Sequence, residues 1–192
     1  ISAYHLTIEP KTLFYKYQQK NKLNLPTENE SLDQLHILME ETAKNGFLHY
    51  EISNFAKDGF ISLHNTNYWR GVKYLGLGPS AHSYNLTSRQ WNISDLHAYL
   101  DGISKSKIPK KEEILTQAEK FNEYLITSLR TMWGLNTEKI KTDFGESFYK
   151  HVKNKSKKFL YEKRMIKSGK NIKLTPKGIF ISDHILENLL YD

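Results

Sequence analysis

The sequence predicts an α/β protein in which strands and helices alternate first and helices dominate later. Residues 2–52 follow the order strand, helix, strand, and helical periodicity is nearly continuous after Ser94. The charge also changes along the chain. Residues 105–177 carry 19 Lys/Arg against 8 Asp/Glu, whereas residues 1–104 carry 9 against 10. We therefore expect two domains, residues 1–104 and 105–192.

The composition is that of a globular protein with a packed core. Of the 192 residues, 39% are hydrophobic and 26% are charged. No stretch reaches the roughly 18 apolar residues of a membrane span, and the first residues lack the features of a signal peptide, so we expect the cytoplasm. The absence of cysteine excludes disulfides and thiolate ligation within these residues. Because no methionine precedes Ile1, which already opens a strand pattern, we expect a fragment of a longer protein.

The first part contains two predicted strands on either side of a helix. Residues 2–8 alternate as a strand does, and Pro10 ends the pattern. A short helical turn is expected at Thr12–Tyr17. A longer helix is expected over Ser31–Lys44, and a second strand over Phe47–Ile52. This order is typical of parallel strands joined by a crossover helix, as in α/β barrels and doubly wound sheets.

The middle of the chain predicts a third strand, a hairpin and the first helices of the second part. The third strand is expected at Tyr74–Gly78, and residues 82–93 resemble a hairpin. Ser94 is a suitable N-cap for a helix over Leu96–Ile103. A long apolar stripe then predicts a helix over Glu112–Met132.

The last part predicts short helices and a small hairpin. Residues 137–152 suggest two helices and residues 156–164 a third, after which Lys167–Asn171 forms a turn between two short strands. Pro176 starts a final helix at its favoured first-turn position. Helices followed by a small hairpin resemble a winged helix, so binding of nucleic acid is one hypothesis for this basic region.

One segment, Tyr50–Tyr84, holds more polar, aromatic and glycine residues than a core strand and its loop require. Within it, His64 stands in the run HNTNYW beside Tyr68 and Trp69. An imidazole can be an axial ligand of heme iron, and aromatic side chains can supply an apolar wall for the macrocycle. The alternative is an ordinary histidine that makes a structural hydrogen bond.

Two glycines of the run GLGPSAH form a second candidate. Gly76 and Gly78 permit a close approach of backbone to a ligand or a positive φ, although a plain turn would explain them as well. The remaining seven histidines include no i, i+4 pair, which argues against a zinc site. The sequence also contains no GxSxG, P-loop or GxGxxG motif, so hydrolase and nucleotide-binding functions have no support. The basic second part would suit nucleic acid, a membrane surface or a tetrapyrrole with propionates, or it is simply a solvated surface.

Four motifs in the first part resemble one known family. SAYHLTIEPKTLF, YEISNFAKDG, HNTNYWRG and YLGLGPSAHSY are similar to the later barrel strands and loops of the HemW/HemN family, the oxygen-independent coproporphyrinogen III oxidase-like radical S-adenosylmethionine proteins. FNEYLITSLRTMWGL and IKLTPKGIFISDHILENLL resemble its C-terminal domain. The resemblance implies part of a radical S-adenosylmethionine (TIM-like) barrel, followed by a mostly helical, winged-helix-like C-terminal domain. Lys11 and Asp58 depart from the family's usual glycine and proline.

The resemblance also implies cofactors. The family holds a [4Fe–4S] cluster on a CxxxCxxC motif and binds S-adenosylmethionine. This sequence lacks the motif, so we expect both cofactors in the full-length protein only and no radical chemistry from this chain alone. The GLGPSAH run resembles the stretch that lines the cofactor pocket. The expected neighbours of S-adenosylmethionine are Gly76, Gly78, Ser80 and Ala81.

The run HNxxYW marks the branch of the family that binds heme and passes it to hemoproteins. Its positions in this chain are His64, Asn65, Tyr68 and Trp69. By resemblance, His64 is the candidate ligand of the heme iron, and acceptor hemoproteins are the implied partners. The first alternative is a coproporphyrinogen III dehydrogenase of porphyrin biosynthesis, and a winged-helix nucleic-acid binder is the second.

Overall fold

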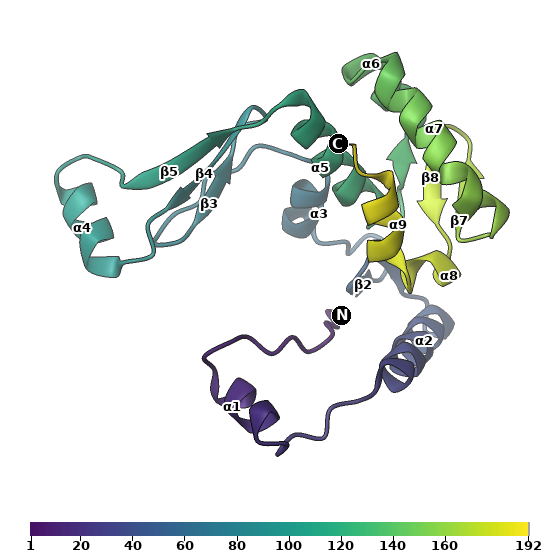
Figure 1. Ribbon diagram of the computed structural model, residues 1–192, viewed down its shortest axis with the longest axis horizontal. Helices are drawn as coiled ribbons and strands as arrows, with labels where there is room; N and C mark the ends of the chain where they lie inside the picture. Colours follow the sequence, from purple (N-terminus) through teal and green to yellow (C-terminus); the bar gives the residue numbers. More distant parts are fainter. Residues whose placement is uncertain (192) are drawn as a thin grey trace. The chain divides into compact units, whose positions relative to one another are not determined.

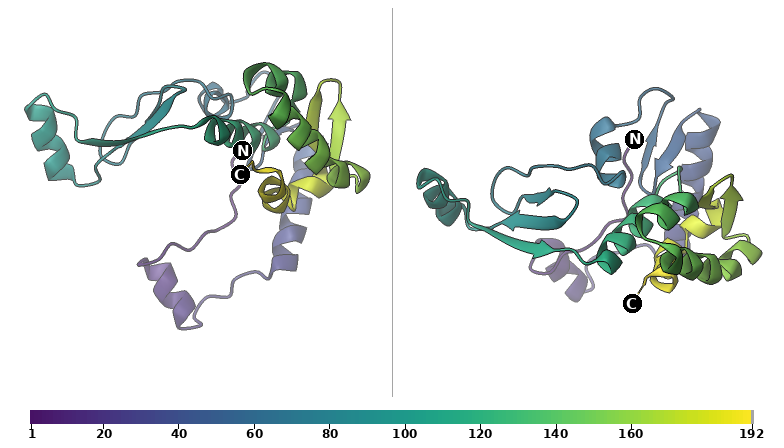
Figure 2. Two further views of the ribbon diagram at one scale, coloured as in Figure 1. Left: turned by 45° about the horizontal axis from the view of Figure 1, so that its top comes forward. Right: turned by 90° about the horizontal axis from the view of Figure 1, so that it is seen from above.

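The computed structural model describes residues 1–191 (Figures 1 and 2). The protein mixes helices with short strands, which confirms the predicted α/β class. It divides into two compact units, Ile1–Ile61 and the chain from Ser62 onward. The predicted domain boundary between residues 104 and 105 is a different division and stays a prediction.

The first unit contains two helices and one small antiparallel sheet. Thr27 caps the longer helix, because its side chain and that of Glu30 each accept a hydrogen bond from the other residue's backbone N–H. This helix starts three residues earlier than expected. The elements are α1 (Leu13–Gln19), α2 (Glu28–Lys44), β1 (Leu48–Glu51) and β2 (Asn54–Ala56).

The predicted parallel arrangement of this unit is wrong. Residues 2–8 form no strand, apart from an isolated antiparallel bridge between Ser2 and Asn54. The expected second strand, β1, instead pairs antiparallel with β2 directly after it. A hairpin between neighbours in sequence closes a very short loop, so it needs no crossover connection. The N–H of Ala3 then donates to the Ser53 carbonyl at 2.8 Å, which places the start of the chain beside this hairpin.

The second unit contains two three-stranded antiparallel sheets and the remaining helices. Their strand orders are β3-β4-β5 and β6-β8-β7. The views agree that α4 lies at the end of the first sheet that is remote from α5 (Figures 1 and 2). The elements are α3 (Leu63–Trp69), β3 (His82–Tyr84), β4 (Ser88–Asn92), α4 (Leu96–Ser104), β5 (Lys110–Ile114), α5 (Gln117–Leu129), β6 (Leu135–Asn136), α6 (Thr137–Asp143), α7 (Glu146–Tyr161), β7 (Met165–Ser168), β8 (Asn171–Leu174), α8 (Pro176–Ile179) and α9 (Ser182–Leu189).

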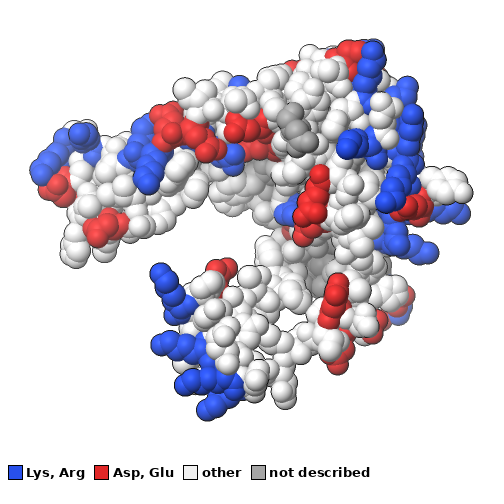
Figure 3. Space-filling view, viewed as in Figure 1, with Lys and Arg blue, Asp and Glu red and all other residues white. Residues whose placement is uncertain are grey.

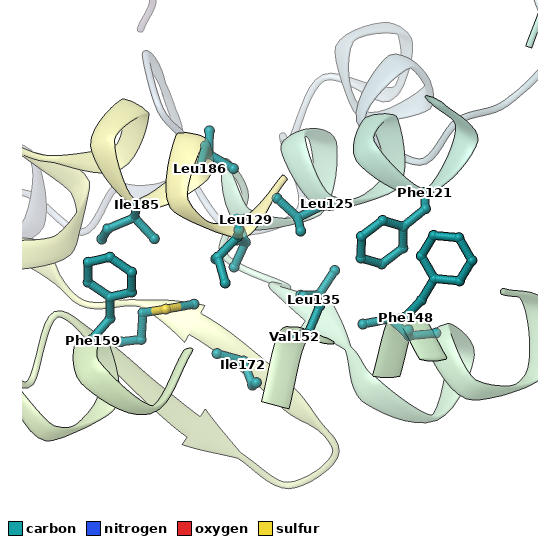
Figure 4. Close-up of a cluster of buried hydrophobic side chains, with 13 residues drawn as sticks. Phe121, Leu125, Leu129, Leu135, Phe148, Val152, Phe159, Ile172, Ile185 and Leu186 are labelled. Atoms are coloured by element: carbon teal, nitrogen blue, oxygen red, sulfur yellow. The ribbon is translucent and has the colours of Figure 1, made fainter. Parts of the chain in front are cut away.

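One hydrophobic core holds the helical part of this unit together (Figure 4). It gathers side chains from α5, α6, α7 and α9 over the sheet β6-β8-β7. Burial of this apolar surface is the main force that stabilises the unit. The core residues are Phe121, Leu125, Leu129, Leu135, Ile140, Phe148, Val152, Phe159, Met165, Ile172, Ile185, Leu186 and Leu189.

Several predicted bounds in this unit need correction. The helix expected from Glu112 begins at Gln117, because residues 110–114 pair with β4 and Thr116 caps the helix after them. Asp95 rather than Ser94 caps α4. The segment Tyr74–Gly78 forms only one bridge, between Tyr74 and Tyr84, instead of a strand. In each case a partner in space decides the outcome, which local propensity cannot show.

The helices near the end of the chain also differ from expectation. The residues 146–161 form one continuous helix, because its apolar side chains keep one buried face throughout. The final helix is instead divided into α8 and α9. The predicted hairpins at residues 82–93 and 165–174 are confirmed. Across residues 1–191, no helix is both long and apolar enough to cross a membrane.

Candidate functional site

The run HNTNYW lies on α3, a helix of seven residues. Ser62 starts the helix, since its side chain accepts a hydrogen bond from the Asn65 backbone N–H at 3.2 Å. His64 and Tyr68 stand one turn apart and therefore share a face. Their rings meet edge to face with centroids 5.0 Å apart, and both side chains are exposed. The histidine is thus accessible and has an aromatic neighbour.

A series of tyrosines continues from this pair to the hairpin β3–β4. The rings of Tyr68 and Tyr74 lie 4.8 Å apart, and those of Tyr74 and Tyr84 lie 6.2 Å apart. Tyr74 and Tyr84 also exchange two backbone hydrogen bonds of 3.0 Å each. Burial is the main cause that raises the pKa of both phenols, so they stay neutral at physiological pH. The result is an uncharged aromatic surface beside His64.

A pocket of about 340 Å³ adjoins the last two tyrosines. One cationic side chain, Lys73, is among the residues that line it. Its apolar surface comes from Leu75 and the rings of Tyr74 and Tyr84, and the other lining side chains are polar. The lining residues are Lys73, Tyr74, Leu75, Ser83, Tyr84, Asn85, Ser88 and Gln90.

Charged side chains lie close to these tyrosines. Arg89 bridges two carboxylates, that of Glu113 at 3.0 Å and that of Glu123 at 2.9 Å. Burial raises the pKa of Glu123, while the nearby Arg89 opposes that shift. The three side chains therefore form a small network of ion pairs that connects β4 to β5 and α5.

Trp69 does not share the exposed face of α3. It follows His64 by five residues, which turns it well away from that histidine around the helix. Its indole Nε1 is buried and has no hydrogen-bond partner within the described part of the chain, and the same holds for the hydroxyl of the buried Thr66. Of the two aromatic residues that were expected to form a wall for the macrocycle, Tyr68 is therefore the one that lies beside His64. The ligand roles of all four residues of the run stay predictions.

The backbone of the run GLGPSAH is held by the protein itself. The N–H of Gly76 donates to the Ser83 hydroxyl at 2.9 Å, and that of Gly78 donates to the Tyr99 hydroxyl at 3.2 Å. The N–H of Ser80 donates to the Ile93 carbonyl, and that of Ala81 donates to the Gly78 carbonyl. These four donors are thus already engaged with protein acceptors.

Different structural requirements explain the glycine at position 76 and the glycine at position 78. A Cβ atom on Gly76 would lie 2.1 Å from the carbonyl oxygen of His82, so the packing of β3 alone requires glycine there. Gly78 has a φ of 102° and open space around its Cα. A ligand can therefore approach the backbone at Gly78, whereas Gly76 is explained without one. The proximity of this run to S-adenosylmethionine stays a prediction.

Sequence reasoning missed the tyrosines at positions 74 and 84 and the ion pairs of Arg89. Tyr74 and Tyr84 meet only because the chain reverses between them, and no local motif marks such a pair. The one available signal was the presence of a tyrosine on each side of the GLGPSAH run. Within residues 1–191, no three Asp, Glu or His side chains gather as metal ligands.

The fold and this site define a mixed α/β protein that presents an exposed histidine beside a row of tyrosines. Residues 115–181 match the family model of the HemN C-terminal domain. A protein of Lactococcus lactis subsp. lactis named "Heme chaperone HemW" is 32% identical over 192 residues, which are 100% of this chain and 50% of that protein. A Bacillus subtilis protein of the same name is 35% identical over 148 residues, or 76% of this chain and 39% of the relative.

A solved structure has the same fold. It is described as "Coproporphyrinogen III oxidase (HemN) from Escherichia coli is a Radical SAM enzyme", and it matches 93% of this chain and 45% of its own chain with a TM-score of 0.67. Its sequence identity is 16%, so this likeness concerns the fold alone. The chain belongs to the HemW/HemN family. It spans about half the length of the first of these relatives.

Proposed function

We propose that this chain supplies part of the heme-binding surface of a protein that delivers heme to hemoproteins. The observation that carries the proposal is the exposed His64 on α3, with Tyr68 packed edge to face against it. The names of the HemW relatives support heme as the cargo. The cytoplasm remains the expected compartment.

Each side chain of the site has a distinct part in this proposal. Heme iron accepts a ligand along its axis, and an imidazole nitrogen of His64 can donate a lone pair to it. Tyr68, Tyr74 and Tyr84 provide an aromatic surface for the macrocycle. The ammonium of Lys73 at the adjoining pocket suits a propionate.

We further propose that the full-length protein holds its [4Fe–4S] cluster and S-adenosylmethionine mainly outside these residues. This chain has no cysteine to ligate a cluster. Because the N–H groups of Gly76, Gly78 and Ser80 are occupied, the GLGPSAH run would contact S-adenosylmethionine through carbonyl oxygens or by van der Waals contact at Gly78.

The finer architecture is also a proposal. We assign residues 1–104 to the end of a partial barrel on the resemblance of their motifs alone, since β1 and β2 pair antiparallel, and residues 105–192 to a winged-helix-like domain. The second assignment is supported by the order α5, β6, α6, α7, β7, β8 and by the position of β8 between its two neighbours. A coproporphyrinogen III dehydrogenase is the alternative for the whole protein, and the likeness of fold to HemN is compatible with it.

Heme titration followed by Soret absorbance tests the proposed function. The variant His64→Ala is expected to lose the saturable binding that the unchanged chain shows. The matched control is His97→Ala, which removes another exposed histidine of the same unit, on α4, and is expected to bind as the unchanged chain does. Equal binding by His64→Ala and the unchanged chain would refute the assignment of the ligand.

A further inference from the structure

A second pocket, distinct from the tyrosine site, lies between α7 and the hairpin β7–β8. Its volume is about 230 Å³. That is smaller than the roughly 300 Å³ at which pockets for drug-sized ligands begin. Figure 3 shows lysine and arginine side chains gathered over this part of the molecule, at the right of the view. The size and the charge together point to a small anion.

Four lysines line the pocket, and no acidic residue does. Lys153 and Lys157 come from α7, one turn apart, while Lys167 and Lys170 come from the facing hairpin. All four are exposed, and none forms an ion pair with a carboxylate of residues 1–191. Positive charges gathered around one cavity raise the local concentration of anions.

The pocket also contains a buried hydroxyl without a partner. Ser156 lines it from α7, is 1% exposed, and its Oγ has no hydrogen-bond partner in the described part of the chain. Buried polar groups are nearly always hydrogen-bonded, so an unpaired one calls for an acceptor from outside the protein. A ligand oxygen at this end of the pocket would accept a hydrogen bond from this hydroxyl.

We propose that this pocket binds a small phosphate-type anion. A tetrahedral anion presents oxygens in several directions, so it can meet one hydroxyl and ammonium groups from two sides. A planar carboxylate is matched best by the paired N–H groups of a guanidinium, and the lining contains lysines but no arginine. The apolar side chains of Leu160 and Ile172 also line the pocket.

The position of the pocket separates it from heme handling. It is formed by α7, β7 and β8, together with Thr137 at the start of α6, whereas His64 and the tyrosines belong to α3 and the hairpin β3–β4. Thr137 donates to the Lys170 carbonyl through both its N–H and its hydroxyl, which holds the hairpin turn against α6. Failure of either proposal would therefore leave the other intact.

Calorimetric titration of this chain with inorganic phosphate, at constant ionic strength, tests the site. The double variant Lys153→Gln/Lys157→Gln is expected to weaken phosphate binding by about tenfold or more, because charge-assisted hydrogen bonds are lost. The matched control is Lys150→Gln/Lys155→Gln, which removes two charges from the same helix outside the pocket. It is expected to change the affinity by less than about twofold, the effect of exposed charges.

The variant Ser156→Ala separates a ligand role from a packing role. It is expected to weaken phosphate binding while the ligand-free chain remains at least as stable, because an unpaired buried hydroxyl is removed. Three outcomes would overturn the proposal: no phosphate binding, equal losses in both lysine pairs, or equally tight binding of a dicarboxylate such as succinate. Tighter binding of duplex DNA, with a steep decrease as salt rises and equal losses in both lysine pairs, would assign the surface to nucleic acid instead.

Discussion

The core of the second unit makes a strong prediction about Phe121 on α5. Its side chain is 0% exposed, and its ring lies 4.7 Å from that of Phe148 and 5.5 Å from that of Phe144. The substitution Phe121→Ala removes the ring and leaves a cavity among these neighbours. Such changes lower the free energy of unfolding by about 3–5 kcal/mol, because transfer and cavity terms add. This is a large fraction of the roughly 5–15 kcal/mol that a domain usually has.

Urea denaturation followed by tryptophan fluorescence measures this change. The matched control is Tyr161→Ala, an aromatic side chain of the same unit that is 90% exposed. It is expected to change the free energy of unfolding by no more than about 0.5 kcal/mol, as is usual at the surface. A loss below about 1 kcal/mol in Phe121→Ala would show that Phe121 is not part of a tightly packed core, and would refute the reasoning.

Two further predictions concern the first hairpin and the glycine run. Burial lowers the pKa of His49 below its ordinary value of 6.5. Below pH 6.5 the unfolded chain therefore binds a proton at His49 more readily than the folded chain does, so the free energy of unfolding falls as the pH drops through 6.5. Denaturation at several pH values should show that this free energy depends less on pH in His49→Gln than in the unchanged chain. Gly76→Ala should lower the free energy of unfolding by about 1–3 kcal/mol without any cofactor present, because the new Cβ meets the His82 carbonyl. Unchanged stability in Gly76→Ala would contradict the packing explanation for this glycine.

Elements with a strong local signal could be predicted from the sequence. Thr12 stands at the expected start of the first helix, which it caps with a side-chain hydrogen bond, and Pro176 stands at the first turn of α8 as expected. The hairpin at residues 165–174 is recognisable because Gly169, with a φ of 59°, forms its turn between apolar residues. These features depend on neighbours in the chain, so the sequence reveals them.

Pairings between distant segments could not be predicted in the same way. Residues 110–114 have the composition of a helix start, but they form β5 because β4 offers a partner. Residues 2–8 alternate like a strand, yet they gain only one bridge, to Asn54. For the site, the motif identified His64 and Tyr68, whereas the contact of Tyr74 with Tyr84 depends on the bridge between their backbones. Tertiary context decides each of these cases.

Identifying the axial ligand of bound heme tests the central claim most directly. The measurement is the Soret spectrum and reduction potential of heme bound to this chain and to its variant His64→Met. If His64 is the ligand, the variant keeps a coordinating side chain of another type, so the spectrum should change and the potential should rise. An identical spectrum and potential in the two proteins would contradict the proposed heme site on α3.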